Sequence, residues 1–249
     1  MLRTGKSEIN SSKPAFIRCS SSRRRTLVRC DEFIHLAQEV IWRQLAKNRE
    51  NALYPAKCYT NFMRIIKHGE GIWTIPDFLS AERCRRLIGF SEGFGFEEAS
   101  VGLSSGAKMM KGVRDNFRAE VDDDELASQM WREVEAEFPA RIQGVRAVGL
   151  NPHFRFYRYE NGQKFKRHID GRQKVGELES RVTWMIYLND DFAGGSTAFD
   201  DIEIRPERGT ALLFIHEQKH EGCPVERGRK YVLRSDVLFA RDGASEDAS

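Results

Sequence analysis

Four strand-like runs between residues 154 and 239 decide the fold of this chain. They are Phe154-Arg-Phe-Tyr-Arg-Tyr159, Arg181-Val-Thr-Trp-Met-Ile-Tyr-Leu188, Thr210-Ala-Leu-Leu-Phe-Ile215 and Lys230-Tyr-Val-Leu-Arg-Ser-Asp-Val-Leu-Phe239. β-Branched and aromatic residues dominate the runs, and glycine-containing turns separate them. Many short strands joined by turns favour two packed sheets. We therefore predict an α+β fold with a mainly β core, a double-stranded β-helix (jelly roll).

Helical patterns precede this β region. Apolar residues recur on one face of residues 31–49 and again, every four residues, over 123–138. Between them, a short strand at 71–75 leads to Ser80, which is placed to cap a helix over 81–90. We expect these helices to support the jelly roll from outside.

These patterns divide the chain into four segments. We predict a basic Ser/Arg-rich segment (1–30), a helical N-terminal extension (31–70), the main domain (71–241, with its core motifs in 150–241) and a flexible tail (242–249). Glycine and serine at 100–112 also predict a mobile loop inside the main domain.

Charge and cysteine content exclude several classes of protein. Residues 1–30 carry a net charge of +7, and the rest of the chain −4, so we expect no nucleic-acid surface on the domain. No apolar run is long enough to cross a membrane. Five scattered cysteines without a CxxC pair indicate reduced thiols in an intracellular, cytoplasmic protein. Residues 1–30 fit either an organelle transit peptide or a disordered basic tail.

One short motif has metal-ligand spacing. His168-Ile-Asp170 puts an imidazole and a carboxylate on the same side of a strand end, and His220 follows another apolar strand. Two histidines and one carboxylate on one face of an octahedron leave three positions open, which suits iron(II). The HxD motif alone is a weak signal, because such residues are usually surface residues.

A second metal motif overlaps the first. His216-Glu-Gln-Lys-His220 matches the HExxH pattern of zinc peptidases, which requires a helix. A buried strand precedes this stretch and Gly222 and Pro224 follow it, so a helix has little room. We therefore keep the zinc peptidase as a remote alternative, and interpret His216 as a core or supporting histidine.

Residues 154–239 resemble the iron/2-oxoglutarate dioxygenases of the prolyl 4-hydroxylase type (alpha-subunit catalytic domain). The matching blocks are Tyr159-Glu-Asn-Gly-Gln-Lys-Phe-Lys-Arg-His168-Ile-Asp170, Tyr187-Leu-Asn-Asp190, Gly194-Gly-Ser-Thr-Ala-Phe199, Pro206-Glu-Arg-Gly-Thr-Ala-Leu-Leu-Phe214 and His220-Glu-Gly-Cys-Pro-Val-Glu-Arg-Gly-Arg-Lys230-Tyr231. Their order and spacing agree over about a third of the chain.

The resemblance implies a role for each of these residues. His168, Asp170 and His220 would be the iron ligands and the catalytic centre. Lys230, ten residues after His220, would pair with the far (C5) carboxylate of the cosubstrate 2-oxoglutarate, and Arg234 on the same face is the alternative. Tyr159 and Tyr187 would hydrogen-bond this carboxylate. The family also implies O2 as a substrate and ascorbate as a reductant.

The substrate is less defined than the chemistry. The resemblance implies hydroxylation of an aliphatic C–H bond with release of succinate and CO2, and a protein or peptide side chain such as proline is our first expectation. A small-molecule or free amino-acid oxygenase and a metal-free binding module are the alternatives. Arg114, Asn116 and Arg118, after the predicted loop, are candidate lid and substrate contacts. The oligomeric state stays open.

Overall fold

The computed structural model describes residues 64–98, 101–103, 106–108 and 115–240. The predicted segments 1–30 and 242–249, and the predicted helix at 31–49, lie outside the described residues. Within the described ranges, no helix has the length and apolarity that a membrane span requires.

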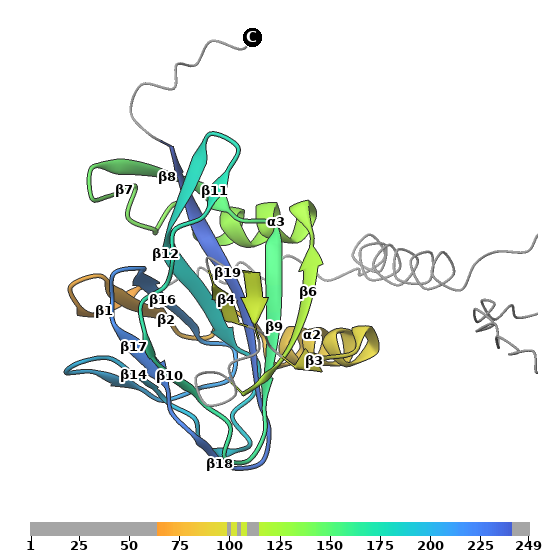
Figure 1. Ribbon diagram of the computed structural model, residues 1–249. Coiled ribbons are helices and arrows are strands. Elements are labelled where there is room, and N and C mark those ends of the chain that lie inside the picture. Colours follow the sequence, from red (N-terminus) through yellow and green to blue (C-terminus); the bar gives the residue numbers. More distant parts are fainter. Residues whose placement is uncertain (1–63, 99–100, 104–105, 109–114, 241–249) are drawn as a thin grey trace, which may run out of the picture. The chain divides into compact units, whose positions relative to one another are not determined.

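The described chain forms two principal sheets (Figure 1). The large sheet has eleven strands. Eight of them follow the order β1 (Ile66–Gly69), β2 (Ile72–Ile75), β16 (Ala211–Ile215), β12 (Leu178–Tyr187), β19 (Lys230–Ala240), β9 (His153–Tyr159), β6 (Phe117–Asp122), β3 (Glu97–Glu98). Three more pair at its margins, namely β7 (Arg141–Ile142), β8 (Val145–Leu150) and β11 (Lys174–Val175).

The smaller sheet contains the strands that carry His168, the first residue of the HxD motif, and His220. Its four strands are, in order, β10 (Phe165–His168), β17 (His220–Gly222), β14 (Thr197–Ala198) and β15 (Glu203–Ile204). Two hairpins complete the β structure, β13 (Ala193–Gly194) with β18 (Val225–Arg227) and β4 (Val101–Leu103) with β5 (Gly106–Lys108). The predicted jelly roll with a mainly β core is confirmed.

Strand alternation gives the large sheet two buried faces. One face packs toward the smaller sheet, and side chains from both sides form a shared hydrophobic core. This core includes Tyr187, Leu212 and Val232 from the large sheet and Phe199 and Ile204 from the side of the smaller sheet. This inner face is the one that carries the candidate site.

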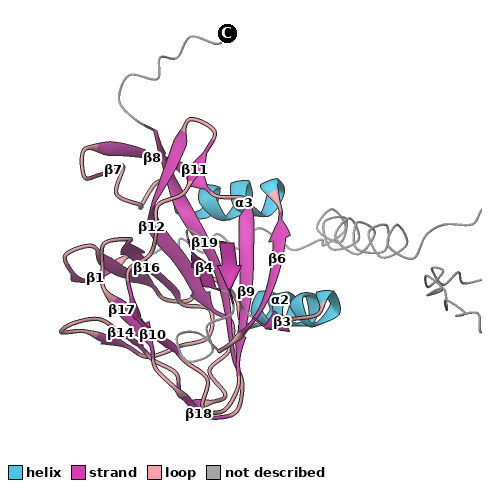
Figure 2. Ribbon diagram, in the orientation of Figure 1, coloured by secondary structure: helices cyan, strands magenta, loops and turns pink. Residues whose placement is uncertain are grey.

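Helices cover the opposite face of the large sheet. α2 (Ala81–Phe94) brings Phe90 against Phe156 of β9, with ring centroids 6.0 Å apart, and Phe78 just before it packs edge-on to Trp184 at 5.0 Å. Figure 2 shows α2 and α3 (Asp124–Val134) beside β9 and β6, away from β10, β14 and β17. The two predicted supporting helices that fall within the described residues, at 81–90 and 123–138, therefore lie outside the jelly roll.

A polar side chain caps the first turn of each of these two helices. Ser80 caps α2 as predicted, because its hydroxyl accepts from the Arg83 amide at 3.2 Å. Asp123 caps α3 in the same way through the Leu126 amide, at 2.8 Å. The prediction that this helix reaches 138 is wrong: it ends at Val134, and residues 135–137 form a turn in which the Phe138 amide donates to the Val134 carbonyl at 2.9 Å. Pro139 disfavours helical backbone at Phe138, so the helix does not resume after this turn.

Two further expectations need correction. Helical structure was expected up to residue 70, but Ile66–Gly69 is a strand that pairs with β2. A loop was expected at 100–112, but Val101–Leu103 and Gly106–Lys108 form a short antiparallel hairpin. In both cases a strand partner a few residues away along the chain, which propensity does not reveal, stabilises the extended backbone.

Candidate metal centre

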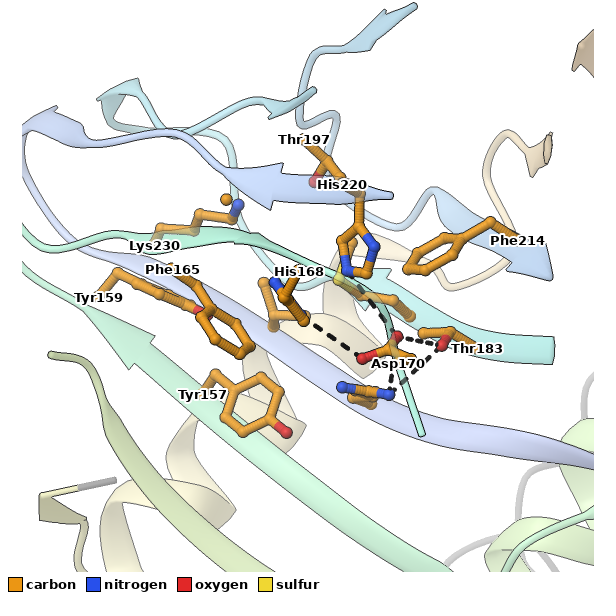
Figure 3. A pocket seen from close by; sticks show the side chains of 14 residues that line it. Tyr157, Tyr159, Phe165, His168, Asp170, Thr183, Thr197, Phe214, His220 and Lys230 are labelled. Carbon is orange, nitrogen blue, oxygen red and sulfur yellow. Dashed lines mark hydrogen bonds and ion pairs between the residues drawn. The ribbon is translucent and has the colours of Figure 1, made fainter. Parts of the chain in front are cut away.

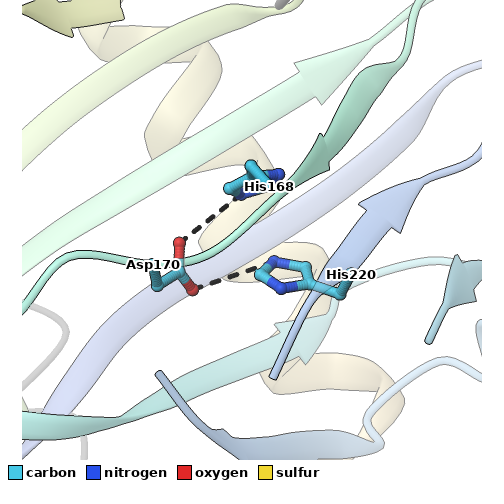
Figure 4. A group of neighbouring side chains, drawn as sticks. All are labelled: His168, Asp170 and His220. Carbon is cyan, nitrogen blue, oxygen red and sulfur yellow. Dashed lines mark ion pairs between the residues drawn. The ribbon is translucent and has the colours of Figure 1, made fainter. Parts of the chain in front are cut away.

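The structure brings His168, Asp170 and His220 together. His168 ends β10 and His220 begins β17, and the two are directly opposite in the antiparallel pairing of these strands. Asp170 follows two residues after His168, where its amide donates to the His216 carbonyl at 3.2 Å. One ligand atom from each of the three side chains lies within 4.8 Å of the others (Figure 4). The cluster thus depends on a cross-strand register as well as on the HxD spacing.

Both imidazoles present the same nitrogen to the centre of the cluster. His168 Nδ1 donates to the Lys166 carbonyl at 2.8 Å, and His220 Nδ1 donates to the Gln218 carbonyl at 2.9 Å. A carbonyl only accepts, so in the neutral rings the lone pairs lie on Nε2. The Nε2 atom of His168 is buried without a hydrogen-bond partner, 3.5 Å from Asp170 Oδ1. A buried, unpartnered lone pair facing a carboxylate fits a metal site.

Burial and neighbouring charges hold His220 and Asp170 in their metal-binding forms. Burial lowers the pKa of His220 to about 4, so its ring is neutral at pH 7. Burial by itself raises the pKa of Asp170, but the Arg234 guanidinium and the hydrogen bond from Thr183 outweigh it and hold that pKa well below the usual range. A neutral imidazole and an ionised carboxylate are the forms that bind metal ions. Two histidines and one carboxylate suit iron(II).

The overlapping HExxH motif does not form a zinc site. Residues 216–219 are a turn between β16 and β17, not a helix. His216 is 1% exposed and its Nε2 lies 3.3 Å from Asp236 Oδ1, away from the cluster. Glu217 pairs with Arg172 at the surface. The interpretation of His216 as a core histidine agrees with this placement.

The cluster opens into a cavity between the two sheets (Figure 3). Its wall comes from both sheets and includes an acid, two histidines, two cations, four phenylalanine or tyrosine residues, and smaller polar and apolar residues: Tyr157, Tyr159, Phe165, His168, Asp170, Thr183, Met185, Thr197, Phe214, His220, Gly222, Lys230, Val232 and Arg234. The two cations lie on one strand, β19, four residues apart and on the same face.

Lys230 is a buried cation with no carboxylate partner among the described residues. It is 4% exposed, and its Nζ donates to the Gly195 carbonyl at 2.5 Å. The rings of Tyr187 and Tyr159 lie 5.2 and 5.5 Å from Nζ. Burial lowers the pKa of Lys230 to about 7. A buried ammonium without a counter-charge is costly, so this end of the cavity is suited to an anion.

Arg234, unlike Lys230, lies beside carboxylates. Its Nη2 lies 2.9 Å from Asp170 Oδ2 and 3.4 Å from Asp236 Oδ1, so it is paired with two carboxylates at the metal end of the cavity. An arginine beside the metal cluster is poorly placed for the far carboxylate of a chelating cosubstrate. Between the two candidates for that role, the geometry favours Lys230.

The remaining predicted residues are spread more widely. Tyr159 lines the cavity, whereas Tyr187 lies behind the wall, fully buried, with its hydroxyl 2.8 Å from Thr197 Oγ1. Asn116 is 1% exposed and donates to the Phe117 carbonyl, and Arg118 pairs with Glu120. Neither lines the cavity. Arg114 lies outside the described residues.

Several wall residues were not predicted. Phe165 stacks on His168 with ring centroids 3.6 Å apart, and Phe214 contacts the ring of His220 at 4.4 Å. Thr183 donates to Asp170 Oδ2 at 2.6 Å. Tyr157 could have been found, because it is two residues from Tyr159 on one strand face. The contact between Thr183 and Asp170 could not, because it depends on how separate strands are placed.

Comparison with known proteins agrees with this site. Residues 154–235 match the family model described as the 2OG-Fe(II) oxygenase superfamily. Probable prolyl 4-hydroxylase 9 of Arabidopsis thaliana is 25% identical over 204 residues, which covers 69% of each chain. Human prolyl 4-hydroxylase subunit alpha-1 is 30% identical over 92 residues, 32% of this chain but only 16% of the human subunit.

Solved structures show the same fold. A prolyl hydroxylase from Trichoplax adhaerens, solved with a hypoxia inducible factor peptide fragment, is 18% identical and has a TM-score of 0.52, covering 68% of this chain and 83% of that one. The viral collagen prolyl hydroxylase of Paramecium Bursaria Chlorella virus-1 is 20% identical with a TM-score of 0.50, covering 70% and 98%.

Fold and sequence together define an oxidoreductase, a jelly-roll oxygenase of the iron(II)/2-oxoglutarate class. More narrowly, residues 154–235 are a 2OG-Fe(II) oxygenase domain of the prolyl 4-hydroxylase type. The family implies Fe(II), 2-oxoglutarate and O2 as the reactants at this site.

Proposed function

We propose that the chain hydroxylates an aliphatic C–H bond of a protein or peptide side chain, with proline as the first candidate. His168, Asp170 and His220 hold the iron, and Lys230 binds the far carboxylate of 2-oxoglutarate. The observation that carries the proposal is the unneutralised Lys230, which lies in the same cavity as the metal cluster. A buried cation and an open-sided metal site in one cavity match the two ends of a chelating dicarboxylate.

The bound iron and cosubstrate supply the oxidising chemistry: O2 and 2-oxoglutarate are consumed, one oxygen atom enters the substrate C–H bond, and the other appears in succinate beside CO2. The protein's own residues do the placing. The Nδ1 hydrogen bonds of His168 and His220 orient their rings. Phe165 and Phe214 pack against these rings and limit their rotation. Tyr159 and Tyr187 surround the Lys230 ammonium and exclude water from it.

The substrate assignment is supported by the names of the relatives. Those similar in sequence are prolyl 4-hydroxylases, and a structural neighbour is bound to a peptide fragment. Since the chain spans only 16% of the alpha-1 subunits, their additional partners are not carried over. Ascorbate is proposed as the reductant that restores iron(II) after turnovers without substrate.

The test has two parts. Under anaerobic conditions, the protein with iron(II) and 2-oxoglutarate should develop a visible charge-transfer band, and His168→Ala should not. With O2, proline-containing peptides should gain the mass of one oxygen atom, in step with succinate formed. If free amino acids or small molecules gain oxygen and no peptide does, the small-molecule alternative holds instead. Absence of both the band and succinate with the wild-type protein would refute the whole proposal.

A further inference from the structure

The carboxylate of Asp170 is held on one of its two oxygens only. Its Oδ2 atom accepts a hydrogen bond from Thr183 Oγ1 at 2.6 Å and lies 2.9 Å from Arg234 Nη2. Figure 3 shows Thr183 beside Asp170 on the side away from Lys230. A carboxylate oxygen has about two lone-pair positions, and both are occupied on Oδ2. Oδ1, which faces His168 Nε2 at 3.5 Å, is the oxygen left for a metal ion.

Arg234 is itself fixed by a second buried carboxylate. Its Nη2 lies 3.4 Å from Asp236 Oδ1, and Asp236 Oδ2 forms an ion pair with Arg155. Nε2 of His216 also contacts Asp236 Oδ1, at 3.3 Å. Arg234, Asp236, Arg155 and His216 are all buried. Asp170, Arg234, Asp236 and Arg155 form a series in which acids and bases alternate. In this series of ion pairs each charge has an opposite charge beside it, so each side chain restrains its neighbour.

Strand register accounts for the arrangement. On the inner face of the large sheet, Arg155 of β9 is opposite Arg234 of β19, and Thr183 of β12 is opposite Asp236. Arg234 and Asp236 are two residues apart, so their side chains lie on the same face. The two residues that contact Asp170 Oδ2 thus come from neighbouring rigid strands, while Asp170 comes from the smaller sheet's side.

We propose that Arg234, with Thr183, is a positioning residue that holds Asp170 as a single-oxygen metal ligand, and that Asp236 and Arg155 hold Arg234 in place. This inference rests on the proposed iron site. It assigns different tasks to the two cations of the cavity: Lys230 binds the cosubstrate, and Arg234 orients a ligand of the metal. Binding through one oxygen of Asp170 would leave more coordination positions of the ion free for cosubstrate and O2 than binding through both oxygens would.

The experiment compares two variants of the full chain, Arg234→Met and Lys230→Met, in two binding measurements. Mn2+ affinity is measured from the free-ion electron paramagnetic resonance signal, and 2-oxoglutarate affinity is measured by calorimetry at saturating Mn2+. Arg234→Met should weaken Mn2+ binding by about 10- to 100-fold, the usual effect of losing a partner of a metal ligand, and leave 2-oxoglutarate affinity nearly unchanged. Lys230→Met should do the opposite.

A spectroscopic measurement separates orientation from mere loss of fold. The Co2+-loaded wild type and Arg234→Met should differ in their visible absorption, because a released Asp170 can bind through both oxygens. Thr183→Val keeps the shape of its side chain and removes the donor to Asp170 Oδ2 together with an acceptor for Arg234 Nη2 at 3.3 Å. It leaves the Arg234 charge in place, so it should change the Co2+ spectrum in the same direction and by less. This variant serves as the test if Arg234→Met does not fold.

The outcomes are distinct. If Arg234→Met loses 2-oxoglutarate affinity and keeps Mn2+ affinity, Arg234 is the cosubstrate's partner and the inference is wrong. If Arg234→Met and Thr183→Val both leave Mn2+ affinity and the Co2+ spectrum unchanged, it is also wrong. If the wild-type protein binds no divalent metal at all, the proposed function fails first, and that result is seen without any variant.

Discussion

Lys230 is the residue on which the cosubstrate assignment depends. Its ammonium is buried against two tyrosine rings and one carbonyl, with no acid beside it in the described chain. Replacing it with methionine keeps most of the volume and removes the charge. Because truncating one partner of a buried charge pair costs about 2–5 kcal/mol, we expect the Kd for 2-oxoglutarate to rise about 100-fold or more. Calorimetry on the Mn2+-loaded protein measures this.

A matched control is Lys174→Met, which removes an exposed lysine from β11. It should leave the Kd for 2-oxoglutarate as in the wild type. Equal Kd values for Lys230→Met and wild type would show that Lys230 does not bind the cosubstrate, whatever the metal ligands do.

The same buried lysine predicts a pH-dependent stability of the ligand-free protein. Burial lowers its folded-state pKa from 10.5 to about 7. Between these two values the unfolded chain binds a proton that the folded chain lacks, so the contribution of Lys230 to stability improves as pH rises through this window. Below pH 7 the folded protein must keep a buried cation. Lys230→Met should therefore be more stable than wild type by about 1–3 kcal/mol near neutral pH, with the gain shrinking toward pH 10.

Urea unfolding of the metal-free proteins across this pH range tests the prediction. Three titratable groups face the ammonium from neighbouring elements: Tyr159, Tyr187 and Cys223. Cys223→Ser is made in both backgrounds, so that the thiol is absent from the comparison. A difference between Lys230→Met and wild type that does not vary with pH would contradict the assigned cause.

At the scale of elements, the junction between α2 and β16 depends on one glycine. Gly209 has φ +84°, and a Cβ there would come within 2.1 Å of the Leu79 carbonyl oxygen. The Leu79 amide also donates to the Gly209 carbonyl at 3.0 Å, immediately before the N-cap of α2. Gly209→Ala should therefore destabilise the protein by about 2–4 kcal/mol through strain and displacement of the helix start.

Gly176 provides the comparison, because it also has a positive φ, +57°, but an added Cβ would meet nothing within 4 Å. Gly176→Ala should cost only about 1 kcal/mol, the conformational part. Thermal unfolding of both variants separates the two terms. Similar losses of stability for the two would mean that the contact with Leu79 is not what constrains Gly209.

An element could be predicted when its own residues carry an apolar pattern, and was missed when it depends on pairing with another segment. The main strands were predicted because β9, β12, β16 and β19 carry their own apolar patterns. The strand β1 was missed, because Ile66–Gly69 is stabilised by its pairing with β2 and not by its composition. The end of α3 was misplaced because Phe138 continues the apolar spacing although the helix has already ended at Val134.

The residues of the candidate site also differ in how far they could be predicted from the sequence. His168, Asp170 and Lys230 could be proposed from spacing and from resemblance, since each lies in a local motif. The engagement of Arg234 with Asp170 could not, because it depends on the smaller sheet folding over the larger one. We propose different tasks for the two cations because of what lies near each of them in the fold, since residue type alone does not separate them.

At the scale of the whole molecule, ligand binding should link the two sheets. Of the proposed metal ligands, His168 and His220 belong to the smaller sheet and Asp170 follows two residues after its strand β10, whereas Lys230 belongs to the large sheet. A metal ion with bound 2-oxoglutarate would span both. Because ligands that bind only the folded state stabilise it by about 2.7 kcal/mol at 100 times their Kd, Mn2+ and 2-oxoglutarate together should raise the unfolding temperature more than Mn2+ alone.

The rise in unfolding temperature that each ligand causes, alone and together, distinguishes the roles of the residues. In the wild type, 2-oxoglutarate should stabilise little without metal, because only Lys230 then holds it, and strongly once Mn2+ is present. Lys230→Met should keep the Mn2+ increment and lose the cosubstrate increment, whereas His220→Ala should lose both. Thermal unfolding with neither ligand, each ligand alone and both together measures all of these. If 2-oxoglutarate stabilised His220→Ala as much as the wild type, the anion would be bound away from the metal cluster, and the two ends of the cavity would not act as one site.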